Sequence, residues 1–137
     1  MAIRPEQLAA ELRRGLAPLY LIHGDEPLLT LEAADAIRAE ARAQGVTERE
    51  VLVVTQGFKW NALEIAAGNL SLFGEAKLVD LRIPTGKPGR DGGEALQRYA
   101  KQLPTEGVTT LVSLPQLDWA TRKAAWFVAL AAAGVEV

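Results

Sequence analysis

The stretch LYLIHGDEPLLTLEAADAI, residues 19–37, changes from a strand pattern to a helix pattern within a few residues. Its first four residues are all apolar and lie between Pro18 and Gly24, which is typical of a strand buried on both faces. Pro27 suits the first turn of a helix. The apolar residues that follow predict one buried stripe, formed by Leu28, Leu31, Ala34 and Ile37. The sequence therefore predicts a strand, a turn and a long helix that reaches Gly45.

The same alternation recurs along the rest of the chain. Three further apolar runs predict strands, at 51–54, 77–83 and 108–112. Apolar residues at helical spacing predict more helices, at 5–15, 60–70, 94–102 and 119–132. Residues 84–93, rich in Gly and Pro, predict a loop, and residues 135–137 resemble the start of a fifth strand. This order predicts an α/β three-layer sandwich, in which a mainly parallel sheet carries helices on both faces.

Composition and charge exclude several classes of protein. The chain has 137 residues, 49% of them hydrophobic and 23% charged, which is the balance of one soluble globular domain. It has no cysteine, so disulfides, thiolate metal sites and a cysteine nucleophile are excluded. The net charge is -2, and the basic residues are spread among acidic ones, which disfavours direct, tight binding of DNA. The first residues form no unbroken apolar run, so we expect a cytoplasmic protein without a membrane anchor.

The turn HGDEP at residues 23–27 lies where parallel α/β folds usually bind ligands. A phosphate-binding loop of the form GxxxxGK[ST] is missing there, and Asp25 and Glu26 would repel an anion. A turn in which one of these acids caps the next helix is therefore the favoured interpretation. His23 is the only histidine, and no ligand motif accompanies it, so we predict neither a metal site nor a catalytic triad.

A small phosphate-dependent enzyme or a receiver domain is the alternative interpretation. It would use Asp25, Glu26 and Asp80, with Ser113, as a pocket for a phosphoryl group. The pattern fits only in part, because Asp80 is followed by Leu81, Arg82 and Ile83 and therefore lies inside its predicted strand. An acceptor aspartate belongs at the exposed end of the strand.

The stretch LSLFG, residues 70–74, needs an explanation because it is strongly apolar just after a predicted helix. If the helix continues, Leu72 lies about 200° around the axis from Leu70, so the two cannot share one buried stripe. If the helix ends near Gly68, the stretch is a connection whose Leu and Phe either pack inside or face a partner. Composition alone favours packing inside.

Taken together, four segments resemble the delta-subunit family of the bacterial DNA polymerase III clamp loader. They are LYLIHGDEPLL at 19–29, Trp60 with Asn61, SLF at 71–73 and AAWFVALA at 124–131. The resemblance covers essentially the whole chain, so residues 1–137 would be the N-terminal domain, without the helical domains of that family. It implies a degenerate AAA+-like domain that has lost its phosphate loop, uses no cofactor and neither binds nor hydrolyses ATP. It also implies no catalysis by this chain, which would serve a holoenzyme with DNA-directed DNA polymerase activity.

The resemblance further implies a hydrophobic wedge that enters a pocket of the sliding clamp, the beta subunit, and helps to open the ring. On this sequence the clamp-binding residues are Leu70, Ser71, Leu72 and Phe73. Adjacent aliphatic and aromatic anchors can fill an apolar pocket on a partner. The other implied partners are the gamma or tau and delta prime subunits, reached mainly through domains outside this sequence. Contact with DNA would be indirect.

Overall fold

The computed structural model describes residues 1–68, 76–103 and 107–137. Five parallel strands form one sheet in the order β2-β3-β4-β1-β5. The strands are β1 (Leu19–Ile22), β2 (Glu48–Val53), β3 (Lys77–Arg82), β4 (Val108–Ser113) and β5 (Val135–Glu136). The helices are η1 (Pro5–Gln7), α1 (Leu8–Arg13), α2 (Pro27–Ala43), α3 (Asn61–Gly68), α4 (Gly89–Lys101), α5 (Trp119–Arg122) and α6 (Ala125–Ala133).

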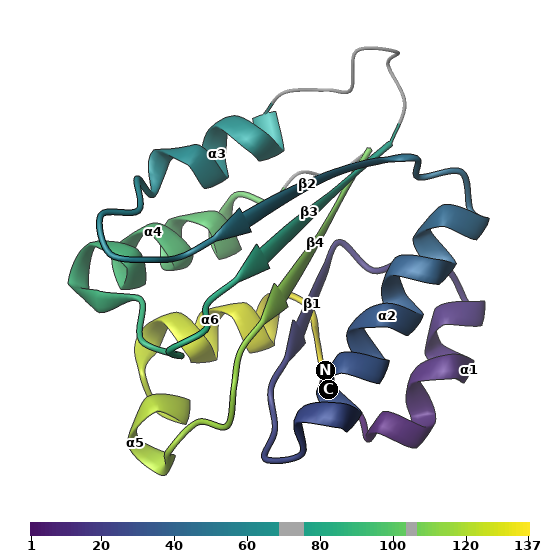
Figure 1. Ribbon diagram of the computed structural model, residues 1–137, viewed down its shortest axis with the longest axis horizontal. Helices are drawn as coiled ribbons and strands as arrows, with labels where there is room; N and C mark the ends of the chain where they lie inside the picture. Colours follow the sequence, from purple (N-terminus) through teal and green to yellow (C-terminus); the bar gives the residue numbers. More distant parts are fainter. Residues whose placement is uncertain (69–75, 104–106) are drawn as a thin grey trace.

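Helices cover both faces of the sheet (Figure 1). One hydrophobic core lies between the strands and α3, α4 and α6, and a second lies between the strands and α1 and α2. Alternate residues of β1 point into different cores: Leu19 and Leu21 enter the first, and Tyr20 and Ile22 enter the second. This two-sided burial explains why the strand sequence is apolar throughout rather than alternating. The predicted three-layer sandwich with a parallel sheet is therefore confirmed.

All strands run in the same direction, so the sheet has two functionally distinct edges. We call the side of the sheet formed by the C-terminal ends of the strands the carboxyl edge, and the side formed by their N-terminal ends the amino edge. Neither name refers to the outer strands β2 and β5. The turn from β1 to α2 lies at the carboxyl edge, and α3 runs back toward the amino edge (Figure 1). Ligands of parallel α/β domains usually bind at the carboxyl edge.

The prediction for α2 is right in its extent but partly wrong in its buried stripe. Ala34 and Ile37 are buried, whereas Leu28 and Leu31 are 64% and 54% exposed. The first turns of α2 lie beside the carboxyl ends of the strands (Figure 1), and Leu31 lines an open cavity there. The amphipathic pattern identifies the helix correctly but cannot show where its supporting sheet stops.

Two other segments differ from the sequence predictions. The predicted loop over 84–93 is shorter than expected, because α4 begins at Gly89 and includes Gly92 and Gly93. A Cβ atom on Gly92 would lie 2.5 Å from the Trp60 ring, so the glycine lets the helix approach that side chain. The predicted continuous helix over 119–132 is divided into α5 and α6 by Ala124, which has an extended backbone.

The predicted second strand is also longer and more exposed than expected. β2 begins at Glu48 and alternates half-buried with exposed residues, because it is the outer strand of the sheet. Val51 and Val53 are therefore exposed although they belong to an apolar run. The fifth strand predicted at 135–137 is present and pairs in parallel with β1.

Candidate functional site

The turn between β1 and α2 has no cradle for a phosphate group. Glu26 occupies the N-cap position of α2, but its side chain makes no capping hydrogen bond, so the predicted side-chain cap is wrong. Pro27 is the first helical residue and lacks an amide hydrogen. Thr30 turns its hydroxyl back to donate to the carbonyl oxygen of Pro27 at 2.9 Å. Asp25 and Glu26 are exposed, which leaves acidic side chains where a phosphate site needs amide donors.

His23 lies at the end of β1, as predicted, and has a partner that the sequence did not indicate. Its Nε2 atom lies 2.8 Å from Oε2 of Glu136 on the neighbouring strand β5. The ring also packs edge-on against Phe127, with 5.2 Å between the ring centroids. The imidazole therefore ties β5 and α6 to the end of β1. In sequence, 113 residues separate His23 from Glu136, so only the pairing of the strands brings them together.

Asp80 is the centre of a buried ion-pair cluster. Its side chain is 0% exposed, and its Oδ2 atom accepts from Nε of Arg38 at 2.9 Å and from an Nη atom of Arg82 at 3.2 Å. Arg49 lies 3.8 Å away on β2. Arg38 also donates to Asp35, one turn earlier on α2. The ion pairs of Asp80 therefore connect α2, β2 and β3 in the interior of the domain.

The arginines determine the charge state of Asp80. Burial on its own would raise the pKa of this carboxyl, but hydrogen bonds from Arg82 and Arg38 and their positive charges outweigh that cost. The pKa of Asp80 is consequently held below its ordinary value of 3.8. A carboxylate that is already shared among arginines is a poor acceptor for a phosphoryl group.

The low pKa of Asp80 predicts a loss of stability in acid. The folded state binds this proton less readily than the unfolded state, so the ionised carboxylate stabilises the fold above the ordinary pKa and stops doing so as pH falls through the lower folded value. We expect the stability difference between wild type and Asp80→Asn to be large at about pH 6 and to shrink at about pH 3. Urea unfolding at both pH values measures it. An equal difference at both would contradict an electrostatic origin.

The alternative phosphoryl pocket is not assembled in this structure. Asp25 lines a small cavity with His23 and Arg122, whereas Asp80 is buried inside β3 behind its arginines. Ser113 lines a different cavity from Asp25. Among the residues that the structure describes, no three His, Cys, Asp or Glu side chains are grouped as metal ligands would be. The acids that the alternative interpretation requires do not converge.

The predicted clamp-binding residues Leu70, Ser71, Leu72 and Phe73 lie outside the described residues. Both flanks of this segment are held at the amino edge. On one side, α3 packs into the core through three buried residues, Leu63, Ala66 and Ala67. On the other, Lys77 at the start of β3 is buried, and its Nζ atom donates to Glu50 at 2.7 Å and to the carbonyl oxygen of Ala66 at 2.9 Å.

Lys77 therefore connects α3 and β3, the two elements on either side of this segment. Its ammonium reaches from the first residue of β3 to the last turns of α3, and Glu50 balances its charge from β2. A buried ammonium needs both a counter-ion and hydrogen-bond acceptors, and this one has them. The end of α3 and the start of β3 are thus held together in a well-packed part of the domain.

Within the described ranges, no helix has both the length and the apolar character that crossing a bilayer requires.

The geometry so far defines a class of protein. It is a parallel α/β domain of the kind that binds nucleotides, but it lacks the phosphate loop at the turn after its first strand.

Comparison with known proteins identifies the family. Residues 20–137 match the family model of the DNA polymerase III delta subunit. The chain is 35% identical over 133 residues to DNA polymerase III subunit delta of Escherichia coli, covering 97% of this chain and 38% of the relative. The identity to the Haemophilus influenzae subunit is 29% over 131 residues, covering 93% and 37%. The chain therefore belongs to the DNA polymerase III delta-subunit family, as the resemblance in the sequence predicted.

A solved structure supports the fold. The Bacillus subtilis DNA clamp loader delta protein superposes with a TM-score of 0.71 at 19% identity, covering 98% of this chain and 42% of that chain. The predicted fold class, an α/β domain with a parallel sheet and helices on both faces, is confirmed. The chain spans about two fifths of the length of these relatives.

Proposed function

We propose that this chain is a clamp-binding domain of a clamp-loader delta subunit and that it works without catalysis of its own. The observation that carries the proposal is the family match over residues 20–137. The absence of a phosphate loop in the sequence and the acidic turn at Asp25 and Glu26 support a binding role rather than ATP hydrolysis. Ring opening then requires only that the domain bind the open clamp more tightly than the closed clamp.

We assign clamp binding to Leu70, Ser71, Leu72 and Phe73. Leu72 and Phe73 are the anchors, because adjacent aliphatic and aromatic side chains can fill an apolar pocket on another protein. Their burial would supply about 3 to 6 kcal/mol before ordering costs. The packing of the neighbouring elements supports this assignment, because Leu63 and Ala66 of α3 lie in the core and Lys77 of β3 donates to the carbonyl oxygen of Ala66.

The proposal extends to the assembly. The chain would act in the cytoplasm within the DNA polymerase III holoenzyme, whose DNA-directed DNA polymerase activity resides in other subunits. Contacts with the gamma or tau and delta prime subunits would come mainly from parts of the protein outside this sequence, and contact with DNA would be indirect.

Phe73→Ala tests the clamp site. We expect the substitution to weaken binding of the chain to purified sliding clamp by about 2 kcal/mol, close to thirtyfold, because truncating an aromatic anchor empties its pocket. Isothermal titration or surface plasmon resonance measures the affinity.

Trp119→Ala is the matched control, because Trp119 is a large exposed aromatic residue on α5. It should bind the clamp as wild type does. Equal affinity for wild type and Phe73→Ala would remove the site assignment, and no binding by the wild-type chain would remove the functional proposal.

A further inference from the structure

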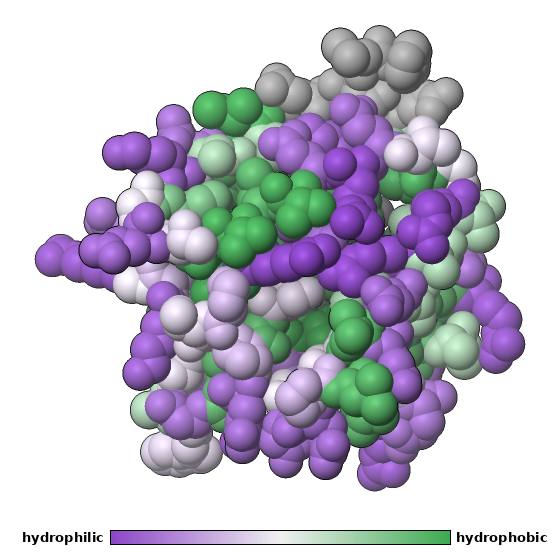
Figure 2. All heavy atoms as spheres, viewed as in Figure 1, coloured by the Kyte–Doolittle hydropathy of each residue, from purple (hydrophilic) through white to green (hydrophobic). Residues whose placement is uncertain are grey.

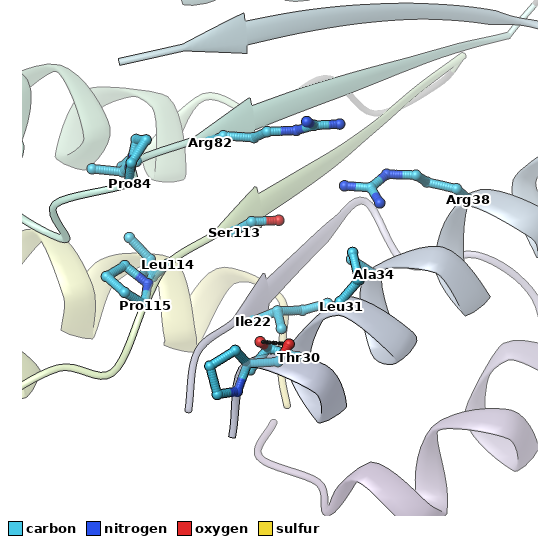
Figure 3. Close-up of a pocket in the computed structure, with 12 residues that line it drawn as sticks. Ile22, Thr30, Leu31, Ala34, Arg38, Arg82, Pro84, Ser113, Leu114 and Pro115 are labelled. Atoms are coloured by element: carbon cyan, nitrogen blue, oxygen red, sulfur yellow. Dashed lines mark hydrogen bonds between the residues drawn. The ribbon is translucent and has the colours of Figure 1, made fainter. Parts of the chain in front are cut away.

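A cavity of about 390 Å³ opens at the carboxyl edge, between α2 and the ends of three strands. Figure 3 shows its residues: Ile22 closes β1, Pro84 follows β3, and Leu114 and Pro115 follow β4. From α2, residues one turn apart face the same space, namely Pro27, Leu31, Ala34 and Arg38. In the space-filling view, apolar surface lies beside a band of hydrophilic side chains here (Figure 2). The cavity has the size and the largely apolar lining of a site for a small molecule.

The charged side chains of the lining are both arginines. Arg38 is buried and divides its donors between Asp35 and Asp80. Arg82 is partly exposed and donates to Asp80 from Nε and one Nη atom, and its hydrogen bonds and ion pairs within the described residues involve only these two atoms. Around Asp80 there are three arginines, counting Arg49, and only two aspartates. The cluster therefore carries an excess positive charge beside an apolar cavity.

Ser113 supplies a second, independent observation. It is the last residue of β4, and its Oγ atom is buried without a hydrogen-bond partner among the described residues. In Figure 3 this hydroxyl points to the side of the cavity where the Arg38 and Arg82 guanidinium groups lie. A buried hydroxyl without a partner is costly, and a bound water, ion or ligand that accepts from it removes that cost.

We propose that this cavity binds a small organic anion, in which a carboxylate or phosphate group is attached to a compact apolar body. The anionic group would accept hydrogen bonds from the free Nη atom of Arg82 and from Ser113, which would pair both orphaned donors at once. The apolar body would lie against Ile22, Leu31 and Leu114. The site differs from a nucleotide site, because the turn before α2 offers acids and a proline instead of amide donors. It is independent of the proposed clamp site.

Three probes that share a phenyl ring test the chemistry: phenylacetate, phenyl phosphate and the neutral phenylacetamide. Each is titrated into the 137-residue chain and followed by amide chemical shifts. We expect at least one anion to bind, with shifts at Ser113, Arg82 and Leu31, and phenylacetamide to bind at least about tenfold more weakly. The stronger of the two anions distinguishes a carboxylate site from a phosphate site. Equal binding of all three, or binding of none, would overturn the proposal.

Two substitutions locate the binding. Ser113→Ala should weaken the better anion by about fivefold while leaving the melting temperature unchanged or higher, because it removes an unpartnered buried hydroxyl. Arg82→Gln should weaken it at least about tenfold. Arg90→Gln is the control, since Arg90 is exposed on α4 away from the cavity, and it should bind as wild type does. Wild-type affinity in both cavity variants would overturn the assignment even if an anion binds elsewhere.

Discussion

Asp80→Asn is expected to destabilise the protein by about 3 to 5 kcal/mol at neutral pH. The side chain keeps its shape but loses the charge that balances Arg38, Arg82 and Arg49. Arg38 is buried, and its remaining carboxylate partner would be Asp35, whose side chain is mostly exposed to solvent. Removing one partner of a buried ion pair costs far more than a typical surface substitution. Urea unfolding monitored by circular dichroism measures the difference.

Asp35→Asn is the matched control for this prediction. Asp35 binds the same arginine, but its side chain is 63% exposed, so solvent screens the interaction. Its loss should cost less than about 1 kcal/mol. Comparable effects of the two substitutions would mean that burial of Asp80 does not govern the strength of its ion pairs.

Gly134→Ala is expected to cost about 3 kcal/mol, at the upper end of the range for overpacking a core. A Cβ atom at this position would lie 2.3 Å from the carbonyl oxygen of Leu19 and 2.7 Å from its Cβ atom. Leu19 is fully buried in β1, which lies between β4 and β5, so the obstacle is the backbone of an inner strand and not a movable side-chain end. The strand β5, which begins at the next residue, would have to move away from β1. Thermal unfolding measures the loss.

Gly68→Ala provides the comparison. Gly68 ends α3, and an added Cβ atom would meet nothing within 4 Å. Alanine favours a helix more than glycine does, so this variant should be as stable as wild type or slightly more stable. If Gly134→Ala unfolds at the same temperature as Gly68→Ala, the close contact with Leu19 is not a constraint on the fold.

The sequence predicted the layers of the fold because strands buried on both faces appear in it as apolar runs. The run at 19–22 is apolar at every position, and the structure buries it between two cores. The run at 77–83 behaves in the same way, although Asp80 lies in its middle. Local propensity was also sufficient for α2, which begins at Pro27 as predicted and ends at Ala43, just before the predicted limit at Gly45.

Details that depend on distant packing could not be predicted. Leu31 has the spacing of a core residue, yet it is largely exposed and lines an open cavity at the ends of the strands. The Gly-rich start of α4 looks like a loop until Trp60 is placed against Gly92. Likewise, the break at Ala124 has no glycine or proline to announce it.

The ion-pair partners of the charged residues were the part of the site that the sequence predicted least well. Asp80 was predicted to lie inside its strand, and it does, but the arginines that surround it come from three different elements. Nothing in the spacing of Arg38 and Asp80, 42 residues apart, indicates that they touch. The clamp-binding assignment at 70–73 rests on the family resemblance and stays a prediction.

Strand β3 runs from the amino edge of the sheet to its carboxyl edge. Lys77 at its first position bonds to α3 at the amino edge, and Arg82 at its last position lines the cavity at the carboxyl edge. Six extended residues place these two side chains roughly 17 Å apart. We therefore expect the proposed clamp site and the proposed anion site to be occupied together without competition, with binding free energies that add unless β3 itself shifts.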